Sequence, residues 1–359
     1  MQMDVDDIYV LADGTVLATA LFDEGLASFS MYQQEGGQPI SKIRGDKSGI
    51  TGGHGITSDE NYIYVMRADS LGGPHYLQRH DLSLTRVKWD NNEPRMLIRA
   101  NPPGPYNRNF VIPQGIVAGV GELYITDPVD RVVRVHSSAT GAFLRSFPIV
   151  TTGTAGGDVP FKITLDHQNN LWVVQRDSSD VYRIRKYDTQ GQYLGRQIGL
   201  TGWAPTDIQY ALVGGVPKLF VADSGPQQVV HRFTNLDSAS ADPTKDWSLG
   251  GSGGALGSGN PGEVTSDRFY FPSGVGVDAS GNVYVSTNGS GHLQFDENKT
   301  IVAQQRIGQG FGAKIYKFDA AKNYQWVLEG LEFVDTAQVD PLDDARVYTK
   351  DSRYLIDYA

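Results

Sequence analysis

A short signature recurs seven times along this chain: an aliphatic residue, a bulky residue, and then Val, Ile or Thr. Six copies have an aromatic residue at the centre, and one weaker copy has Leu there and ends in Ala. The copies lie at residues 16–18 (the weaker one), 63–65, 123–125, 171–173, 219–221, 283–285 and 347–349. Their spacing of roughly 45–65 residues is that expected of one propeller blade per copy. The sequence therefore predicts an all-β fold, a β-propeller, in which each copy forms one strand of a blade.

The fullest repeat indicates how each blade is built. Residues 271–278 form an alternating strand, the Ala-Ser-Gly-Asn segment 279–282 reverses the chain, and a second strand starts at residue 283. A third and a fourth strand follow, as at 182–187 and 193–198 in another repeat. We therefore expect four-stranded antiparallel blades, with the aromatic residue of each second strand buried between neighbouring blades.

A single propeller domain is expected over residues 1–359. Its approximate blades are residues 1–45, 50–100, 110–150, 158–200, 203–250, 268–330 and 332–359. The count of repeats favours seven blades, with six as the alternative. The last repeat stops after its third strand, so its blade is expected to be incomplete. Because natural proteins usually cover exposed strand edges, this repeat predicts that the chain belongs to a larger multidomain protein.

Charge and hydropathy exclude two classes of partner. The chain has 41 acidic and 31 basic residues, a net charge of −10, and no run rich in Lys or Arg, so nucleic-acid binding is not expected. No stretch reaches the ~18 apolar residues of a membrane span. There are no cysteines, which excludes disulfides and thiolate metal sites. The compartment stays open: no signal peptide is visible, and a secreted or periplasmic bacterial protein is favoured over a cytoplasmic one.

The repeat resembles that of the NHL-repeat family of β-propellers. The resemblance rests on residues 272–287, with a Pro-x-Gly-Val turn and a Gly-Asn turn, and on the Leu-Phe-Val-Ala-Asp strand at 219–223. The resemblance extends over essentially the whole chain. Within the family, the chain is most similar to bacterial NHL-repeat proteins that have long Gly-rich loops between blades. The resemblance implies the fold and leaves function open, because the family includes interaction modules, sensor domains, lyases and lactonase relatives.

The long interblade segments indicate where a ligand binds. Residues 99–112, 151–159, 250–270 and 288–313 are expected on one face of the propeller, where the first strands also begin. The openings of the first strands, with aromatic and basic neighbours, supply the candidate ligand-binding residues. These are His54, Gln114, Phe161, Lys162, Arg176, Thr206, Asp207, Ser273, Asp335, Tyr106 and Trp203.

No cofactor is firmly implied, but Ca²⁺ is one expectation. Asp6, Asp7, Asp207 and Asp335 all open first strands, and carboxylate oxygens suit this ion. Zinc-dependent amidating lyases related to this family place His repeatedly at this turn, whereas only His54 does so here, which argues against such a lyase. A second ring follows the second strands: Asp23, Asp69, Asp127, Asp177, Asp223, Asn288 and Asp351. We expect this second ring to cap turns through backbone N–H groups.

Two functions remain open, beside a third in which the chain is a sensor or scaffold domain of a larger protein. The first is a non-catalytic module that recognises a glycan, a protein or a small molecule through the loop-rich face. The alternative is a hydrolase or lyase acting on a carbohydrate or small molecule at the channel mouth, where a bound divalent metal is a further option. In that case His54 is the candidate acid or base, and Lys162 or Arg176 the candidate to neutralise a carboxylate. The sequence identifies no catalytic residue beyond these candidates.

Overall fold

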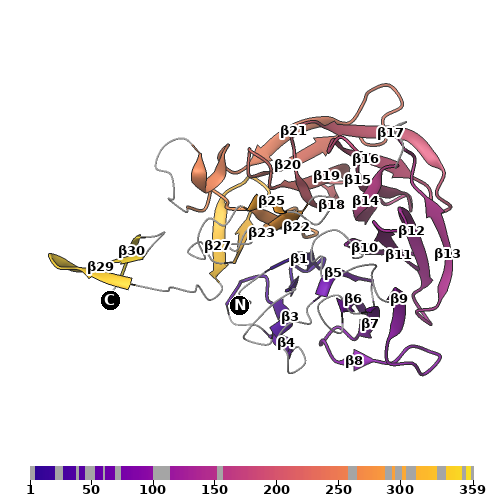
Figure 1. Ribbon diagram of the computed structural model, residues 1–359, viewed down its shortest axis with the longest axis horizontal. Coiled ribbons are helices and arrows are strands. Elements are labelled where there is room, and N and C mark those ends of the chain that lie inside the picture. Colours follow the sequence, from indigo (N-terminus) through magenta and orange to yellow (C-terminus); the bar gives the residue numbers. More distant parts are fainter. Residues whose placement is uncertain are drawn as a thin grey trace.

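The computed structural model consists of antiparallel β-sheets that follow one another around an axis (Figure 1). It describes residues 5–20, 27–37, 40–44, 53–59, 61–68, 74–99, 114–151, 157–257, 265–287, 293–295, 301–304, 313–329, 337–349 and 353–356. Its only described helix is a short 3₁₀ turn, η1 (Gly254–Leu256). Among these residues no helix is long and apolar enough to cross a membrane.

The first three sheets are meanders of consecutive strands. The first contains β1 (Asp7–Val10), β2 (Val16–Thr19), β3 (Ala27–Tyr32) and β4 (Ser41–Arg44). The second contains β5 (Gly53–Ser58), β6 (Ile63–Ala68), β7 (His75–His80), β8 (Arg86–Val87) and β9 (Met96–Arg99), of which both β8 and β9 pair with β7. The third contains β10 (Ile116–Ala118), β11 (Glu122–Asp127), β12 (Val132–Ser137) and β13 (Phe143–Pro148).

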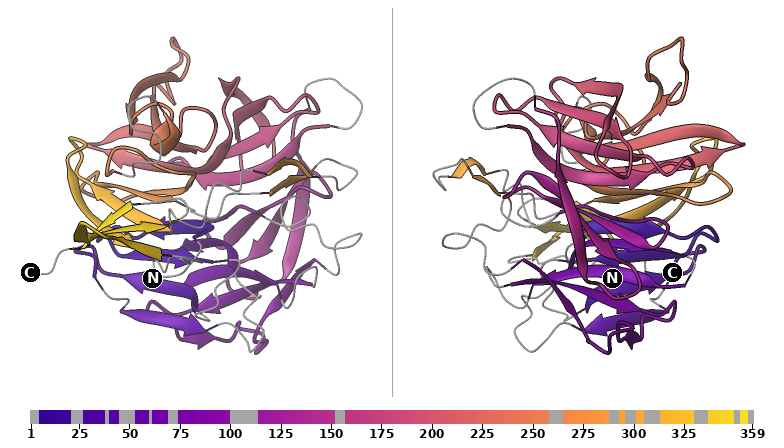
Figure 2. Two further views of the ribbon diagram at one scale, coloured as in Figure 1. Left: turned by 60° about the vertical axis from the view of Figure 1, so that its left-hand side comes forward. Right: turned by 90° about the vertical axis from the view of Figure 1, so that its right-hand side faces the viewer.

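The next three sheets repeat this plan. The fourth contains β14 (Val159–Leu165), β15 (Leu171–Arg176), β16 (Tyr182–Tyr187) and β17 (Tyr193–Leu200). The fifth contains β18 (Pro205–Val213), β19 (Val216–Asp223), β20 (Val229–Thr234) and β21 (Thr244–Leu249). The sixth contains β22 (Pro272–Val277), β23 (Val283–Thr287), β26 (Lys314–Phe318) and β27 (Tyr324–Glu329). Between β23 and β26 the chain forms a separate hairpin of β24 (Leu293–Phe295) and β25 (Ile301–Gln304), which projects from one side of the ring (Figure 2).

These six sheets close the ring. The first strands β1, β5, β10, β14, β18 and β22 pack against one another in chain order, and β22 packs against β1. The fold is therefore a β-propeller, and the predicted all-β class is confirmed. Four-stranded antiparallel blades are confirmed for five of the six sheets, and the second has a fifth strand. The sequence left six and seven blades open and favoured seven; the ring holds six.

The seventh repeat forms a sheet of its own outside the ring. It consists of β28 (Ala337–Asp340), β29 (Asp343–Thr349) and β30 (Arg353–Leu355), the three strands that the repeat predicts. These strands pair only with one another among the described residues, and Figure 1 shows them apart from the ring. The sequence therefore has seven repeats but the ring has six blades, because the strands of the seventh repeat do not join the ring.

The aromatic residues of the signature form the interblade core. Their side chains are almost fully buried in five blades: Tyr64, Tyr124, Trp172, Phe220 and Tyr284. Each packs in a cluster that joins residues of neighbouring blades, as expected. In the seventh repeat, by contrast, Tyr348 is 40% exposed, because no second blade covers it among the described residues.

Small residues let the first strands approach one another closely at the axis. A Cβ atom added to Gly115 of the third blade would lie 2.6 Å from the Phe161 carbonyl oxygen and 2.9 Å from the Lys162 Cα atom. A Cβ atom added to Gly274 of the sixth blade would lie 3.1 Å from the Ile8 amide nitrogen. All three neighbours are backbone atoms, which cannot turn aside as a flexible side chain does.

We expect Gly115→Ala to destabilise the propeller, because it forces the first strands of the third and fourth blades apart. The free energy of unfolding should fall by about 1–3 kcal/mol, the usual cost of overpacking. The matched control is Gly199→Ala in β17, where an added Cβ meets nothing within 4 Å. That change should leave stability unchanged or raise it by up to about 1 kcal/mol. Urea unfolding followed by tryptophan fluorescence measures both, and equal midpoints for the two variants would contradict the close approach.

Candidate functional site

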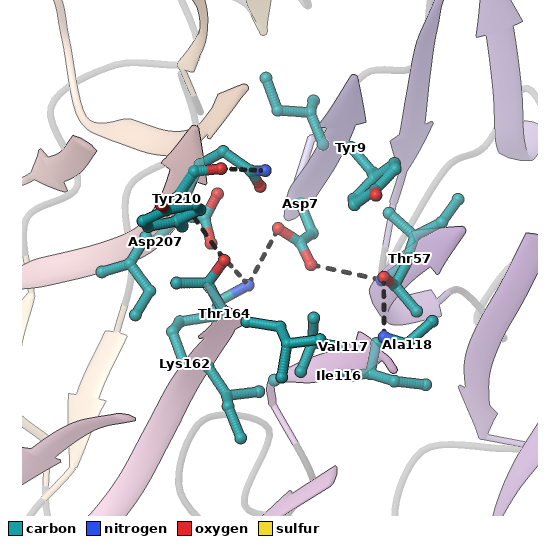
Figure 3. Close-up of a pocket in the computed structure, with 17 residues that line it drawn as sticks. Asp7, Tyr9, Thr57, Ile116, Val117, Ala118, Lys162, Thr164, Asp207 and Tyr210 are labelled. Atoms are coloured by element: carbon teal, nitrogen blue, oxygen red, sulfur yellow. Dashed lines mark hydrogen bonds and ion pairs between the residues drawn. The ribbon is translucent and has the colours of Figure 1, made fainter. Parts of the chain in front are cut away.

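A cavity of about 230 Å³ lies on the propeller axis. Its wall consists of the first strands of five consecutive blades: β1, β5, β10, β14 and β18 (Figure 3). Because every first strand runs in the same direction along the axis, equivalent positions of the repeat form successive layers around the cavity. The chemistry of the cavity therefore depends on which residue each blade supplies to a given layer.

One layer is formed by the third residue of the motif that opens each first strand. Around the ring these residues are Asp7, Gly55, Gly115, Lys162, Asp207 and Gly274. Three blades thus supply glycine, and three supply a charged side chain. A side chain at this position points toward the next blade, so the glycines let neighbouring first strands approach closely.

The three charged residues of this layer form one cluster, the axial triad of Asp7, Lys162 and Asp207. The Lys162 Nζ atom lies 3.0 Å from Asp7 Oδ1 and 3.9 Å from Asp207 Oδ1. All three side chains are buried. The first and fourth blades are opposite one another in a ring of six, so the ion pair between Asp7 and Lys162 spans the axis (Figure 3).

Both carboxylates also join neighbouring blades. The Ile56 N–H of the second blade donates to Asp7 Oδ2 at 3.3 Å, and the Val275 N–H of the sixth blade donates to Asp207 Oδ2 at 2.9 Å. Threonines do the same one layer further along the axis. The Ala118 N–H donates to Thr57 Oγ1 at 3.3 Å, and the Tyr210 N–H donates to Thr164 Oγ1 at 3.1 Å. These contacts orient the polar groups of the cavity wall.

The axial triad contains one more carboxyl group than ammonium group. Burial, together with the negative charge of Asp7, raises the pKa of Asp207 to about 8. Burial also raises the pKa of Asp7, although the Lys162 ammonium opposes this shift. Burial alone would lower the pKa of Lys162, but attraction to Asp7 and Asp207 outweighs it and raises that pKa. Because Asp7 lies nearer the ammonium, the proton held by the cluster at neutral pH resides on Asp207.

Aliphatic residues and neutral polar side chains form the rest of the cavity wall. Tyr9, Gln209 and Tyr210 follow the axial triad along their strands. The Tyr9 hydroxyl donates to the Ser58 carbonyl oxygen at 3.2 Å, and the Tyr210 hydroxyl contacts His167 Nδ1. Burial raises the pKa of both tyrosines, so their hydroxyls stay protonated at neutral pH. The wall away from the triad therefore carries no charge.

Of the candidate ligand-binding residues, the structure brings Lys162 and Asp207 into the cavity. In three of the other candidates, the hydroxyl group or aromatic ring contacts another residue of the protein. The Thr206 hydroxyl donates to the Pro272 carbonyl oxygen at 2.7 Å, and Ser273 Oγ lies 2.9 Å from Ser286 Oγ. The Trp203 ring stacks on His231 at 3.8 Å. These contacts join or stabilise blades, and none of the three residues lines the cavity.

The remaining candidates lie elsewhere. The Phe161 side chain is buried in the interblade core, and the Arg176 guanidinium lies over its ring at 5.2 Å. Gln114 precedes the cavity wall and is half-buried. His54 lies in β5, but its side chain is outside the described residues, as are Tyr106 and Asp335 altogether.

The expected second ring caps turns where the structure describes it. Asp127 accepts the Val129 N–H at 3.0 Å, and Asp177 accepts the Ser179 N–H at 2.9 Å. Asp223 accepts the Gly225 N–H at 2.8 Å. This prediction is confirmed for these three residues. The other four members, Asp23, Asp69, Asn288 and Asp351, lie outside the described residues.

The axial triad does not fit a Ca²⁺ ion. Calcium needs six to eight oxygen ligands, whereas Asp7 and Asp207 face an ammonium group that already supplies positive charge. Within the described ranges, no group of three or more His, Asp or Glu side chains is arranged to hold a metal ion. Asp335, one of the four aspartates expected to bind Ca²⁺, is not among the described residues, so Ca²⁺ binding by the full set stays a prediction.

Comparisons with known proteins support the fold and do not identify a function. No family model and no curated protein matches the sequence. The β-propeller domain of Myceliophteria thermophila Cps50 (Swd1) is 13% identical, with 92% of this chain and 88% of that chain covered and a TM-score of 0.49. A chain of a nidogen/laminin complex is 13% identical, with 89% and 91% covered and a TM-score of 0.49. Myxococcus xanthus glutaminyl cyclase is 12% identical, with 62% and 86% covered and a TM-score of 0.40. These likenesses are too distant to support an argument about activity.

Several residues of the cavity wall escaped the sequence prediction. Asp7 was expected at the opening of its first strand and as a Ca²⁺ ligand, but not among the ligand-binding residues. Tyr9, Thr57, Thr164, Gln209 and Tyr210 were not expected at the site. A signal for them exists in the sequence, because all belong to the first strands and follow the motif at fixed offsets. Aligning the six motifs places Asp7 with Lys162 and Asp207 in one position.

We expect the stability of the protein to depend on the ionisation of Asp207. A carboxyl group whose pKa is raised by folding stabilises the folded state below its ordinary pKa of 3.8, and this contribution is lost as the pH rises toward its folded pKa of about 8. Asp207→Asn, which stays neutral, removes the effect. The free energy of unfolding of the wild type, relative to this variant, should therefore fall by up to about 1.4 kcal/mol per pH unit within that window.

Urea unfolding at several pH values from about 5 to 9 measures this difference. Asp242→Asn is the matched control, since it makes the same replacement of a carboxyl group by an amide at a side chain that is 98% exposed. A wild-type minus Asp207→Asn difference that does not vary with pH would contradict a protonated Asp207.

Proposed function

We propose that this protein is a non-catalytic ligand-binding β-propeller of the NHL-repeat type. Its axial cavity binds a small polar ligand, or one polar residue of a larger glycan or protein that lies over the loop-rich face. The observation that carries the proposal is the cavity of about 230 Å³ with the buried axial triad in its wall. Assignment to the NHL-repeat type rests on the motifs at residues 219–223 and 272–287.

The cost of burying charge favours a binding role for the cavity. Removing charged groups from water is unfavourable, and apolar residues of similar volume often serve a purely structural role as well or better. Three blades nevertheless supply the charged residues Asp7, Lys162 and Asp207 at the axis, although apolar side chains of similar volume would fill the same space. Pockets for drug-sized ligands measure about 300–1,000 Å³. A cavity of about 230 Å³ therefore suits a ligand of the size of one sugar unit or one amino acid.

The position of the triad is consistent with recognition at the loop-rich face. Asp7 and Asp207 lie at or near the beginnings of β1 and β18, and Lys162, midway along β14, extends to them. The long interblade segments that precede β10, β14 and β22 lead into the corresponding strands at that same end. The carboxyl, ammonium, hydroxyl and amide groups of the wall complement the hydroxyl groups of a sugar.

A hydrolase or lyase is the second candidate, and the observation that favours it is the environment of Asp207. Perturbed carboxyl groups in a cavity are common in active sites, and a protonated carboxyl group at neutral pH is suited to general acid catalysis. Asp7, which is paired with Lys162, supplies a second carboxyl group of different character. Turnover of a saccharide probe that is lost in Asp207→Asn would favour this candidate over simple binding.

We expect Gln209→Phe to abolish ligand binding by filling the cavity. Gln209 lines the wall and is half-buried, so a larger ring enters the cavity with little disturbance of the core. Gln190→Phe, in the exposed turn between β16 and β17, is the matched control. Saturation-transfer NMR against a panel of monosaccharides and amino acids should detect binding to the wild type and to the control variant, with the Gln209→Phe signal at least tenfold weaker.

Two results would contradict this proposal. Binding that survives Gln209→Phe would place the ligand outside the axial cavity. The absence of binding by any panel member to the folded wild type would indicate that the axial triad serves only to close the ring.

A further inference from the structure

The sign of the charge in the axial cavity restricts the ligand. Two carboxyl groups and one ammonium group are buried together, so the cluster is balanced only if it gains one further positive charge. Lys162 contacts Asp7 at 3.0 Å and is 3.9 Å from Asp207, beyond hydrogen-bond distance. Asp207 is therefore the carboxyl group that needs a second cation, and it lines the cavity.

We propose that the axial cavity binds the primary ammonium group of a small ligand at Asp207, in exchange for the proton that otherwise neutralises this carboxyl group. This inference rests on the proposed function, because it names the class of ligand for the same cavity. In the exchange, the O–H bond of the Asp207 carboxyl group breaks, its proton passes to solvent, and the carboxylate pairs with the ligand ammonium. No electron is transferred and no other co-reactant is needed.

The wall beside Asp207 suits an ammonium group, which offers three hydrogen-bond donors. Thr164 and Gln209 line the same part of the cavity and carry oxygen atoms that can accept. A polyol, by contrast, would leave the missing positive charge unsupplied. The net charge of −10 also favours the approach of a cation over that of an anion.

The titratable and charged groups around Asp207 come from several elements. They are Asp6 before β1, Asp7 and Tyr9 in β1, Lys162 in β14, and Tyr210 in β18 with His167 against its hydroxyl. Both tyrosines remain neutral, and attraction to the aspartates keeps Lys162 charged. The proton released on binding an ammonium group therefore comes from Asp207. Below the Asp207 pKa of about 8, the apparent dissociation constant of the ammonium ligand should rise about tenfold for each unit by which the pH falls.

Ethanolamine and ethylene glycol are the matched probes, since they differ only in one ammonium group against one hydroxyl group. Isothermal titration calorimetry of the full chain, in buffers of different ionisation enthalpy, measures affinity and proton release together. We expect ethanolamine to bind with release of close to one proton near pH 7, and ethylene glycol to bind at least tenfold more weakly. Asp207→Asn should lose the preference for ethanolamine, whereas Asp242→Asn, at an exposed site, should keep it.

Lys162→Met provides an independent test. This variant leaves Asp7 and Asp207 without their ammonium partner, so it should be less stable than the wild type, and ethanolamine should raise its melting temperature more than ethylene glycol does. Equal binding of the two probes without proton release would overturn the inference while leaving the proposed binding function intact. Failure of ethanolamine to bind either the wild type or Lys162→Met would also overturn it. The monosaccharide and amino-acid panel then tests the proposed function separately.

Discussion

The ion pair between Asp7 and Lys162 across the propeller axis connects the packing of the ring to the chemistry of its cavity. It joins the first and fourth blades, which face one another in a ring of six, at 3.0 Å. At the equivalent position of the other three blades, Gly55, Gly115 and Gly274 have no side chain, and neighbouring first strands approach closely there. Asp207 then adds a second carboxyl group to a buried site that holds only one ammonium. The need to balance this excess charge connects the packing of the fold to its chemistry.

Much of the fold could be predicted from the sequence, because each blade repeats the same local pattern. The alternating strands, the tight turns and the buried aromatic residue all follow from short-range periodicity. The turn-capping role of Asp127, Asp177 and Asp223 was predictable for the same reason. The pairing of Asp7 with Lys162 was not, because opposite blades exist only in a ring with an even number of them. A seven-bladed ring would place no two positions directly across the axis.

The seventh repeat and the aromatic candidates show why local pattern is insufficient. Residues 347–349 carry the same signature as the blades, yet β28–β30 form a sheet outside the ring, where Tyr348 is 40% exposed. Whether a strand joins a ring depends on which surfaces it can cover, and β22 already packs against β1. Trp203 was likewise a candidate for stacking on a ligand, but its ring stacks on His231 of β20. Such contacts depend on the tertiary arrangement and have no short-range signal.

The central claim is that Asp207 holds a proton in the folded protein at neutral pH. Infrared difference spectroscopy of the wild type against Asp207→Asn tests this claim directly, since a protonated carboxyl group has a carbonyl stretch distinct from that of a carboxylate. We expect a protonated-carboxyl band that belongs to Asp207 near pH 6 and disappears as the pH rises through about 8. A spectrum near pH 6 that shows Asp207 only as a carboxylate would contradict it.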